Sequence, residues 1–226
     1  TNNLTEPIRV KVVVTTDKCY QPHDGPWGYR ETDPLGGHDP YSASKACAEL
    51  AVASYRASFL NADDGRGHRV LIASARAGNV IGGGDWAADR LVPDLVRGAL
   101  AGVPVPIRFP DAVRPWQHVL EPLGGYLMLG ERLLAGEAQC AQAWNFGPAP
   151  GDAWPVRRVV EAFARDWPQA RASLCPDPAN PHEAAALRLD CSKADLELGW
   201  QPVWRLDQAL ARTARWYRGW HGGGEV

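Results

Sequence analysis

The sequence predicts an α/β protein built around a parallel sheet. Short apolar, β-branched runs alternate with longer amphipathic segments along most of the chain, which is the pattern of strand–helix–strand units. The runs are apolar throughout, as expected for strands that are buried on both faces. After about residue 150 the texture changes, and two further amphipathic segments predict a smaller, mostly helical C-terminal lobe.

The first quarter of the chain contains the clearest strand and the clearest helix. Val10–Thr16 is a β-branched apolar run and is predicted as a buried strand. A loop rich in Gly, Pro and Asp follows at Asp17–Pro40. Ala, Leu and Lys spaced for an amphipathic face then predict a helix from Ser42 to about Asn61, which the breaker cluster Asn61–Gly67 ends.

The remaining elements continue the alternation. Further strands are expected at Val70–Ala75 and Ala143–Phe146. Expected helices are 91–101, 119–135 with an interruption at Gly124-Gly125, Val156–Trp167, 192–199 and 206–220. We therefore expect two domains, 1–150 and 151–226, of which the first carries the sheet.

Composition narrows the class of protein. The 226 residues are 45% hydrophobic and 22% charged, as in soluble globular proteins, and the net charge of −2 attracts neither nucleic acid nor a membrane surface. Five cysteines without a C-x-x-C pair, and histidines without metal-like spacing, predict a reducing cytoplasm and no metal site. No apolar run reaches membrane-spanning length and no signal-peptide pattern is present. Because the chain begins with Thr1, we expect a fragment or a processed product.

Tyr41-Ser-Ala-Ser-Lys45 is a Y-x-x-x-K motif at the start of a predicted helix. Residues four apart lie on one face of a helix, so the lysine ammonium can lie near the phenol and stabilise its ionised form. A tyrosine needs such help to act as a base at neutral pH. The alternative is a tyrosine and a lysine on a solvated helix face, and the motif alone leaves both interpretations open.

A second polar group follows the first strand. Thr16, Asp17 and Lys18 come where a parallel sheet presents residues at its C-terminal edge, the edge at which ligands bind in open α/β sheets. A hydroxyl, a carboxyl and an amine in succession suit the hydroxyl groups of a sugar. In isolation, a polar turn capped by its aspartate explains these three residues equally well.

Together, these motifs resemble the CDP-glucose 4,6-dehydratases, which are extended short-chain dehydrogenases/reductases of the NAD-dependent epimerase/dehydratase family. Thr16, Tyr41 and Lys45 match the Ser/Thr-Tyr-Lys triad, and Asp17-Lys18 matches this group, whereas related dTDP-glucose and GDP-mannose dehydratases carry Asp-Glu. The resemblance spans roughly Val12 to Tyr217 through the segments TTDKCY, WGYRETDPLGGHDPYSASKACAEL, ARAGNVIGGGDWAADRLVPDLVR, AVRPWQHVLEPLGGYL and LRLDCSKADLELGWQP. It implies an incomplete Rossmann-type parallel sheet with a substrate-binding C-terminal lobe.

The resemblance also implies roles in the dehydration of CDP-glucose to CDP-4-keto-6-deoxyglucose with bound NAD. Tyr41 would take the proton of the sugar 4-hydroxyl, Lys45 would hold the nicotinamide ribose, and Thr16 would hydrogen-bond the 4-oxygen. Asp17 is the expected acid for the departing 6-hydroxyl. Lys18 is the expected base at C5, a role that requires a neutral amine.

Further binding residues follow from the same resemblance. Ala77 and Gly78 would lie beside the nicotinamide, where a glycine allows close backbone approach. Gly82–Gly84 is interpreted as a loop on the substrate side. The residues expected to bind the sugar nucleotide are Asn79, Arg90, His182 and Arg114, of which Arg114 would pair with the diphosphate.

The chain departs from this family in one motif. Extended reductases hold the NAD pyrophosphate at a G-x-x-G-x-x-G turn between a strand and a helix, and here the first glycine is Gly25. The expectation is therefore an N-terminally truncated relative, and an inactive remnant that binds its ligand stays open beside the enzyme. A sugar-nucleotide epimerase is disfavoured because epimerases lack the Asp-Lys pair. Family members pair through the tyrosine-bearing helix, so a homodimer is a further expectation.

Overall fold

The computed structural model describes residues 9–23, 25–60, 70–175 and 186–223. The chain divides into two compact units, each assembled from three segments. Unit 1 comprises Thr1–Ala77, Leu123–Phe146 and Asp190–Gln201, and unit 2 comprises Gly78–Pro122, Gly147–Leu189 and Pro202–Val226. The units are thus interleaved in sequence, unlike the contiguous ranges 1–150 and 151–226, whose assignment to NAD and substrate binding stays a prediction.

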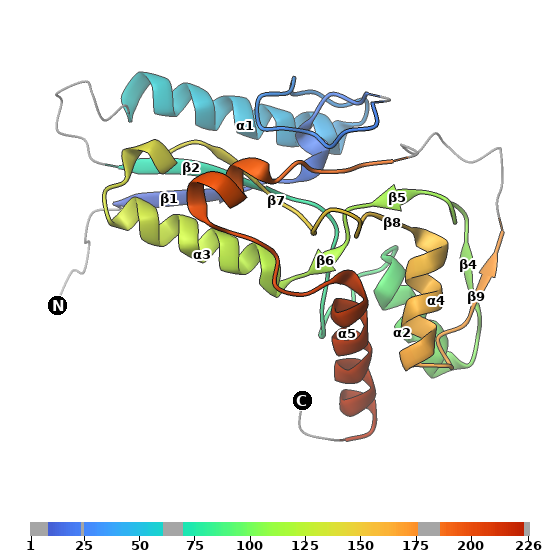
Figure 1. Ribbon diagram of the computed structural model, residues 1–226. Helices are drawn as coiled ribbons and strands as arrows, with labels where there is room; N and C mark the ends of the chain where they lie inside the picture. Colours follow the sequence, from blue (N-terminus) through green and yellow to red (C-terminus); the bar gives the residue numbers. More distant parts are fainter. Residues whose placement is uncertain (1–8, 24, 61–69, 176–185, 224–226) are drawn as a thin grey trace, which may run out of the picture. The chain divides into compact units, whose positions relative to one another are not determined.

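Unit 1 is built on a three-stranded parallel sheet (Figure 1). Its strands are β1 (Val10–Val14), β2 (Leu71–Ala77) and β7 (Ala143–Phe146), in the order β1-β2-β7. β2 is the central strand and is buried along its whole length, which explains its continuous run of small and apolar residues. The predicted parallel α/β arrangement is confirmed, with each strand within two residues of its expected bounds.

Two helices cover the faces of this sheet, α1 (Pro40–Phe59) on one side and α3 (Leu120–Leu134) on the other (Figure 1). α1 begins two residues earlier than predicted because Asp39 accepts a hydrogen bond from the Ser42 amide and Pro40 fits the first turn. The unit also contains the short turns η1 (Asp17–Cys19), η2 (Ala138–Cys140) and η3 (Ala194–Leu198). The amphipathic segment 192–199 therefore belongs to unit 1 rather than to the C-terminal lobe.

The predicted interruption of α3 at Gly124-Gly125 is wrong, because the helix runs through both glycines. Gly125 packs directly against a ring of the central core: a Cβ at this position would lie 2.4 Å from Phe146 Cδ1. A glycine here lets the helix approach the sheet more closely than any side chain allows. The pair marks close packing and not a break.

Unit 2 spans as many residues as unit 1 and combines helices with short strands and loops. Its helices are α2 (Leu91–Ala101), α4 (Val156–Asp166) and α5 (Leu206–His221), which share a core that includes Leu95, Phe163, Leu210 and Tyr217. Three two-stranded ladders accompany them: β3 (Val80–Ile81) with β6 (Gln117–His118), β4 (Val105–Ile107) with β9 (Ala172–Leu174), and β5 (Val113–Arg114) with β8 (Trp154–Pro155). Across the described ranges of both units, no helix is long and apolar enough to cross a membrane.

Candidate active site

The first candidate group lies where the chain leaves β1. Thr16 is extended, with φ −151°, and caps η1 by accepting a hydrogen bond from the Lys18 amide at 3.4 Å. Its hydroxyl donates to Asp17 Oδ1 at 3.0 Å. Thr16 and Asp17 are buried, whereas Lys18 is exposed. The turn therefore holds a hydroxyl and a carboxyl in one fixed arrangement at the C-terminal edge of the sheet.

The second candidate group lies in the first two turns of α1. The Lys45 ammonium lies 5.6 Å from the centre of the Tyr41 ring, within the range in which a cation and an aromatic ring attract each other. Tyr41 is 53% exposed, so its phenol is accessible to a ligand. Since η1 packs against α1, unit 1 brings together the two elements that carry all five predicted catalytic residues.

The predicted binding residues Ala77, Gly78 and Asn79 lie at the end of the central strand β2 and directly after it. Ala77 is the last residue of β2 and lies opposite Phe146 of β7, and Gly78 follows it as the first residue of unit 2. In unit 2, the Asn79 carbonyl accepts a hydrogen bond from the Gln117 amide at 3.0 Å. Their contacts with cofactor or sugar nucleotide stay predictions.

The three predicted cationic ligands differ in their surroundings. Arg114 is buried, and its Nη1 donates to the Val113 carbonyl at 2.8 Å. Arg90 is exposed and forms an ion pair with Asp85 at 3.1 Å. His182 lies outside the described residues. A diphosphate-binding role for Arg114 remains a prediction.

A buried ion pair behind the catalytic groups was not predicted. Glu49 of α1 and Arg76 of β2 are 2% and 3% exposed, and Arg76 Nη2 lies 2.8 Å from Glu49 Oε2. Burial opposes ionisation of Glu49, but Arg76 and the hydroxyls of Thr15 and Ser74 outweigh it and hold the pKa of this carboxyl below its usual value. The available signal was a charged residue within the otherwise uncharged strand LIASARA.

The pair continues into a chain of buried hydrogen bonds. Arg76 Nη1 donates to the Tyr20 hydroxyl at 2.8 Å, and that hydroxyl donates to Asn145 Oδ1 at 2.7 Å. The Asn145 amide group donates in turn to the Tyr29 carbonyl at 2.9 Å. Because Tyr20 directly follows η1, the chain of bonds connects the candidate turn with α1, β2 and β7.

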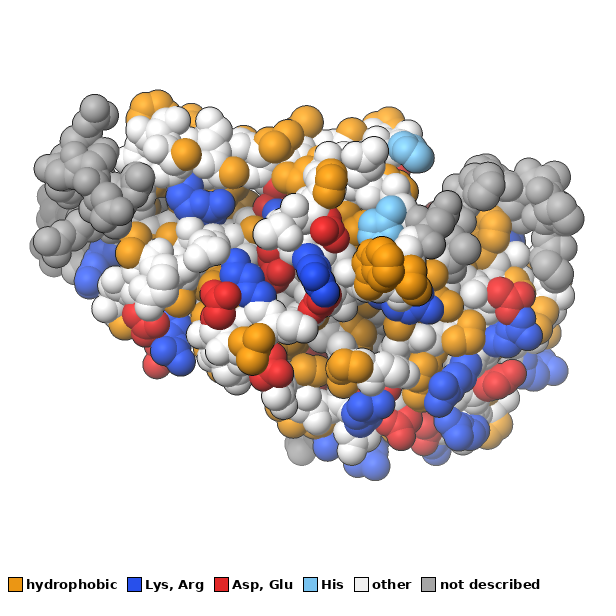
Figure 2. Space-filling model, turned by 45° about the horizontal axis from the view of Figure 1, so that its top comes forward, with side chains coloured by type: hydrophobic (Ala, Val, Ile, Leu, Met, Phe, Trp, Pro, Cys, Tyr) orange, Lys and Arg blue, Asp and Glu red, His pale blue; other side chains and the backbone are white. Residues whose placement is uncertain are grey.

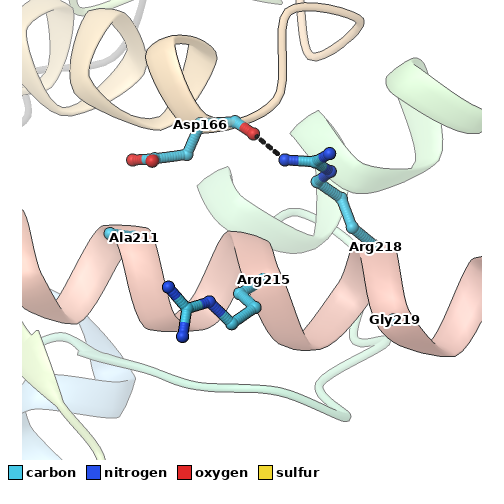
Figure 3. Close-up of a pocket in the computed structure, with 5 residues that line it drawn as sticks. All are labelled: Asp166, Ala211, Arg215, Arg218 and Gly219. Carbon is cyan, nitrogen blue, oxygen red and sulfur yellow. Dashed lines mark hydrogen bonds between the residues drawn. The ribbon is translucent and has the colours of Figure 1, made fainter. Parts of the chain in front are cut away.

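A cavity of about 430 Å³ lies in unit 2, between the end of α4 and α5 (Figure 3). Its lining residues are Asp166, Ala211, Arg215, Arg218 and Gly219, and Arg218 Nη1 donates to the Asp166 carbonyl at 2.8 Å. None of them is a predicted site residue, and none provides a nucleophile.

No group of His, Cys, Asp and Glu suited to a metal ion occurs in the ranges that the structure describes. Figure 2 shows basic and acidic side chains interspersed over one face of the molecule.

Comparison with known proteins gives three consistent results. Residues 4–145 match the model of the NAD dependent epimerase/dehydratase family. CDP-glucose 4,6-dehydratase of Salmonella typhimurium is 48% identical over 213 residues, which cover 94% of this chain and 59% of that protein. dTDP-glucose 4,6-dehydratase of Streptomyces antibioticus is 30% identical over 92% of this chain and 57% of that protein. The chain thus spans somewhat less than three fifths of the length of these curated relatives.

Solved structures support the same fold. DesIV, a dTDP-glucose 4,6-dehydratase from Streptomyces venezuelae with NAD and TYD bound, superimposes with a TM-score of 0.76 at 25% identity, over 96% of this chain and 62% of DesIV. UDP-glucose 4-epimerase of Thermotoga maritima reaches the same TM-score at 18% identity, over 94% of this chain and 64% of the epimerase, and this likeness concerns the fold alone.

Proposed function

The chain belongs to the NAD-dependent epimerase/dehydratase family, and we propose that it carries the catalytic residues for dehydrating CDP-glucose to CDP-4-keto-6-deoxyglucose. One observation carries this proposal: the turn with Thr16, Asp17 and Lys18 packs against the helix with Tyr41 and Lys45. The Asp17-Lys18 pair favours elimination over epimerisation, because loss of water needs an acid for the hydroxyl and a base at the adjacent carbon.

The residues of this chain fit one end of NAD. Tyr41 and Lys45 lie on α1, which packs against the turn η1 that follows β1, and a glycine at position 78 would allow close backbone approach of a ligand. These residues, with Ala77, would hold the nicotinamide end. The sequence contains no G-x-x-G-x-x-G turn for the pyrophosphate. Bound NAD would supply reversible hydride acceptance, from C4 of the sugar and back to C6.

The side chains of unit 1 would move the protons of the reaction. Tyr41 takes the proton of the 4-hydroxyl as its carbon is oxidised, and Lys45 stabilises the phenolate. Thr16 donates a hydrogen bond to the 4-oxygen. The new ketone acidifies the C5 proton, which Lys18 removes while Asp17 protonates the departing 6-hydroxyl, so that one water leaves the sugar. As C6 is reduced, the Lys18 ammonium returns its proton to C5, and the proton held by Tyr41 replaces the one that Asp17 gave up. This role of Lys18 requires its neutral amine.

We propose that the CDP-sugar is held by Asn79, Arg90, Arg114 and His182, with the Arg114 guanidinium on the diphosphate. The exposed apolar side chains of α1, Leu50, Tyr55 and Phe59, support a homodimer paired through that helix. A nucleotide-sugar substrate and five scattered cysteines fit a reducing cytoplasm.

The test is mass spectrometry of CDP-glucose after incubation with the purified chain and NAD. The expected result is a sugar nucleotide lighter by one water with no accumulation of NADH, and no such product with Tyr41→Phe. An unchanged mass with wild-type protein would overturn the proposed reaction.

A second candidate function, binding of the sugar nucleotide without turnover, stays open beside the enzyme. Calorimetric titration with CDP-glucose separates the two. Heat of binding with no change in substrate mass would favour the binding protein.

A further inference from the structure

Glu49 continues the catalytic face of α1. Tyr41, Lys45 and Glu49 are spaced four residues apart, so they lie on one face of the helix, one turn after another. Exposure falls along this row: Tyr41 is exposed, Lys45 is half-buried and Glu49 is buried. The row therefore starts at the surface and ends in an anchor within unit 1.

That anchor connects α1 to both neighbouring strands. Glu49 Oε1 accepts a hydrogen bond from the hydroxyl of Thr15, the residue directly before Thr16. Glu49 Oε2 accepts from Ser74 Oγ of β2 at 2.7 Å. Because both strand hydroxyls bind one carboxylate, α1 has a defined position along β1 and β2. A helix shifted by one turn would lose these bonds.

Arg76 connects the same anchor to the turn η1. Its Nη2 lies 2.8 Å from Glu49 Oε2 and its Nη1 lies 2.8 Å from the Tyr20 hydroxyl, so one guanidinium spans both partners. Tyr20 directly follows η1 (Asp17–Cys19) in the chain. The planar guanidinium fixes the directions of its hydrogen bonds, unlike a flexible ammonium group. It thereby relates the helix that carries Tyr41 and Lys45 to the turn that carries Asp17.

Stability alone gives little reason for this pair. Replacing a buried ion pair by well-packed apolar residues is often neutral or stabilising, because removing two charges from water is costly. The opposite face of the same sheet shows that unit 1 can pack a helix with apolar side chains only. A buried pair has one property that apolar packing lacks, which is defined direction and distance between its partners.

We propose that Glu49, Arg76 and Tyr20 are positioning residues, which fix η1 relative to α1 so that Thr16 and Asp17 face the catalytic row of the helix. The catalytic consequence rests on the dehydration proposed above, whereas the structural consequence does not. A displacement of about 1 Å in such a site can cost roughly 100-fold in rate.

The test compares Glu49→Gln with Val52→Ala, a matched substitution at another buried position of α1. We expect Glu49→Gln to shift the backbone amide resonances of Thr16, Asp17 and Lys45 in nitrogen-15 NMR spectra, and Val52→Ala to leave them in place. In turnover of CDP-glucose, we expect kcat of Glu49→Gln to fall about 10- to 100-fold with KM within about twofold. Val52→Ala should retain the wild-type kcat.

The two measurements separate the failure of this inference from the failure of the proposed reaction. If wild-type protein shows no turnover, the reaction is wrong, and the amide spectra alone decide the positioning role. Resonance shifts confined to Thr15, Ser74 and Arg76, which contact Glu49 directly, would overturn that role. Shifts that reach η1 with an unchanged kcat would overturn its catalytic consequence.

Discussion

The two faces of the sheet in unit 1 differ in how they are packed. The face toward α3 is apolar, with Leu129 and Leu133 of the helix packed against alternate residues of the strands, and Trp200 completing the cluster. The face toward α1, here called the polar face, buries apolar residues such as Ile72 but also a polar cluster, in which Thr15, Ser74 and Arg76 bind Glu49. Alternation of side chains along each strand makes this possible, because neighbouring residues point to opposite faces.

This difference shows how one sheet separates stability from chemistry. The apolar face buries rings and aliphatic chains, which stabilise the unit in proportion to the area they remove from water. The polar face gains little net stability from its ion pair but gains defined geometry beside the candidate catalytic residues. If this separation is correct, the stability losses caused by substitutions on the two faces should differ in two ways. They should depend differently on pH, and only a loss on the polar face should be restored by a second substitution.

The largest effect is expected for Arg76→Met. This substitution leaves the Glu49 carboxylate buried without its cation, which should lower the free energy of unfolding by about 3–5 kcal/mol at neutral pH. The loss is measured by unfolding the whole chain in urea and monitoring hydrogen exchange of the peptide that contains β2. Adding Glu49→Leu should restore most of it, because the uncompensated charge is then removed. A double variant as unstable as Arg76→Met would show that packing, not charge, dominates this face.

A somewhat smaller loss, about 3 kcal/mol, is expected for Leu129→Ala on the apolar face. Leu129 is fully buried in the cluster between α3 and the sheet, so truncation leaves a cavity. The same urea measurement applies, and the loss should not change with pH. Leu127→Ala is the matched control, since Leu127 lies on the same helix and is 76% exposed. The control should stay within about 0.5 kcal/mol of wild type, and equal losses in both variants would contradict this assignment of the core.

Tyr20→Phe tests the polar face by removing one oxygen atom. Its hydroxyl accepts from Arg76 and donates to Asn145, and both partners are buried, so about 1–3 kcal/mol of stability should be lost. Tyr55→Phe is the control, because Tyr55 is 59% exposed on α1. Calorimetric melting of both variants provides the comparison. A Tyr20→Phe variant as stable as its control would mean that other groups or water satisfy Arg76 and Asn145.

The same contrast explains how much of unit 1 could be predicted from sequence. The apolar face depends on local periodicity, so β1, β2, β7 and α3 were expected close to their observed bounds. The interruption of α3 was predicted wrongly because a glycine indicates a helix break or a close approach equally well. Only the position of Phe146 in the fold distinguishes these two meanings. The ladders of unit 2 were missed because strands of two or three residues leave no periodic pattern.

The candidate site was predictable only in part. Tyr41 and Lys45 follow from a local spacing, and the polar turn at Thr16 follows from the end of a strand. The pairing of Glu49 with Arg76 joins residues 27 positions apart, and no local pattern indicates which buried charges will meet. Arg76 was recognisable as a charged residue in an otherwise uncharged strand, but Glu49 could be identified as its partner only from the structure.

The smallest effect is a pH dependence that distinguishes two carboxyls of unit 1, those of Glu49 and Glu31. Although burial opposes its ionisation, the pKa of Glu49 is held below its usual value by Arg76 and two hydroxyls, so the folded state binds fewer protons there than the unfolded state. Its contribution is therefore complete above about pH 4.3, the unfolded value, and is lost as the pH falls through the folded pKa. The difference in stability between wild type and Glu49→Gln should then be constant above about pH 5 and shrink below it.

The pKa of Glu31, in the same unit, is shifted in the opposite direction. Burial raises the pKa of its carboxyl, so its contribution is complete below about pH 4.3 and is lost as the pH rises through the folded value. Urea midpoints of wild type, Glu49→Gln and Glu31→Gln between about pH 3 and pH 7 separate the two groups. A Glu49→Gln difference that grows as the pH falls would mean that burial outweighs Arg76. In that case the anchor of α1 would be a neutral carboxylic acid, and the fixed direction attributed to the ion pair would have to come from hydroxyl hydrogen bonds alone.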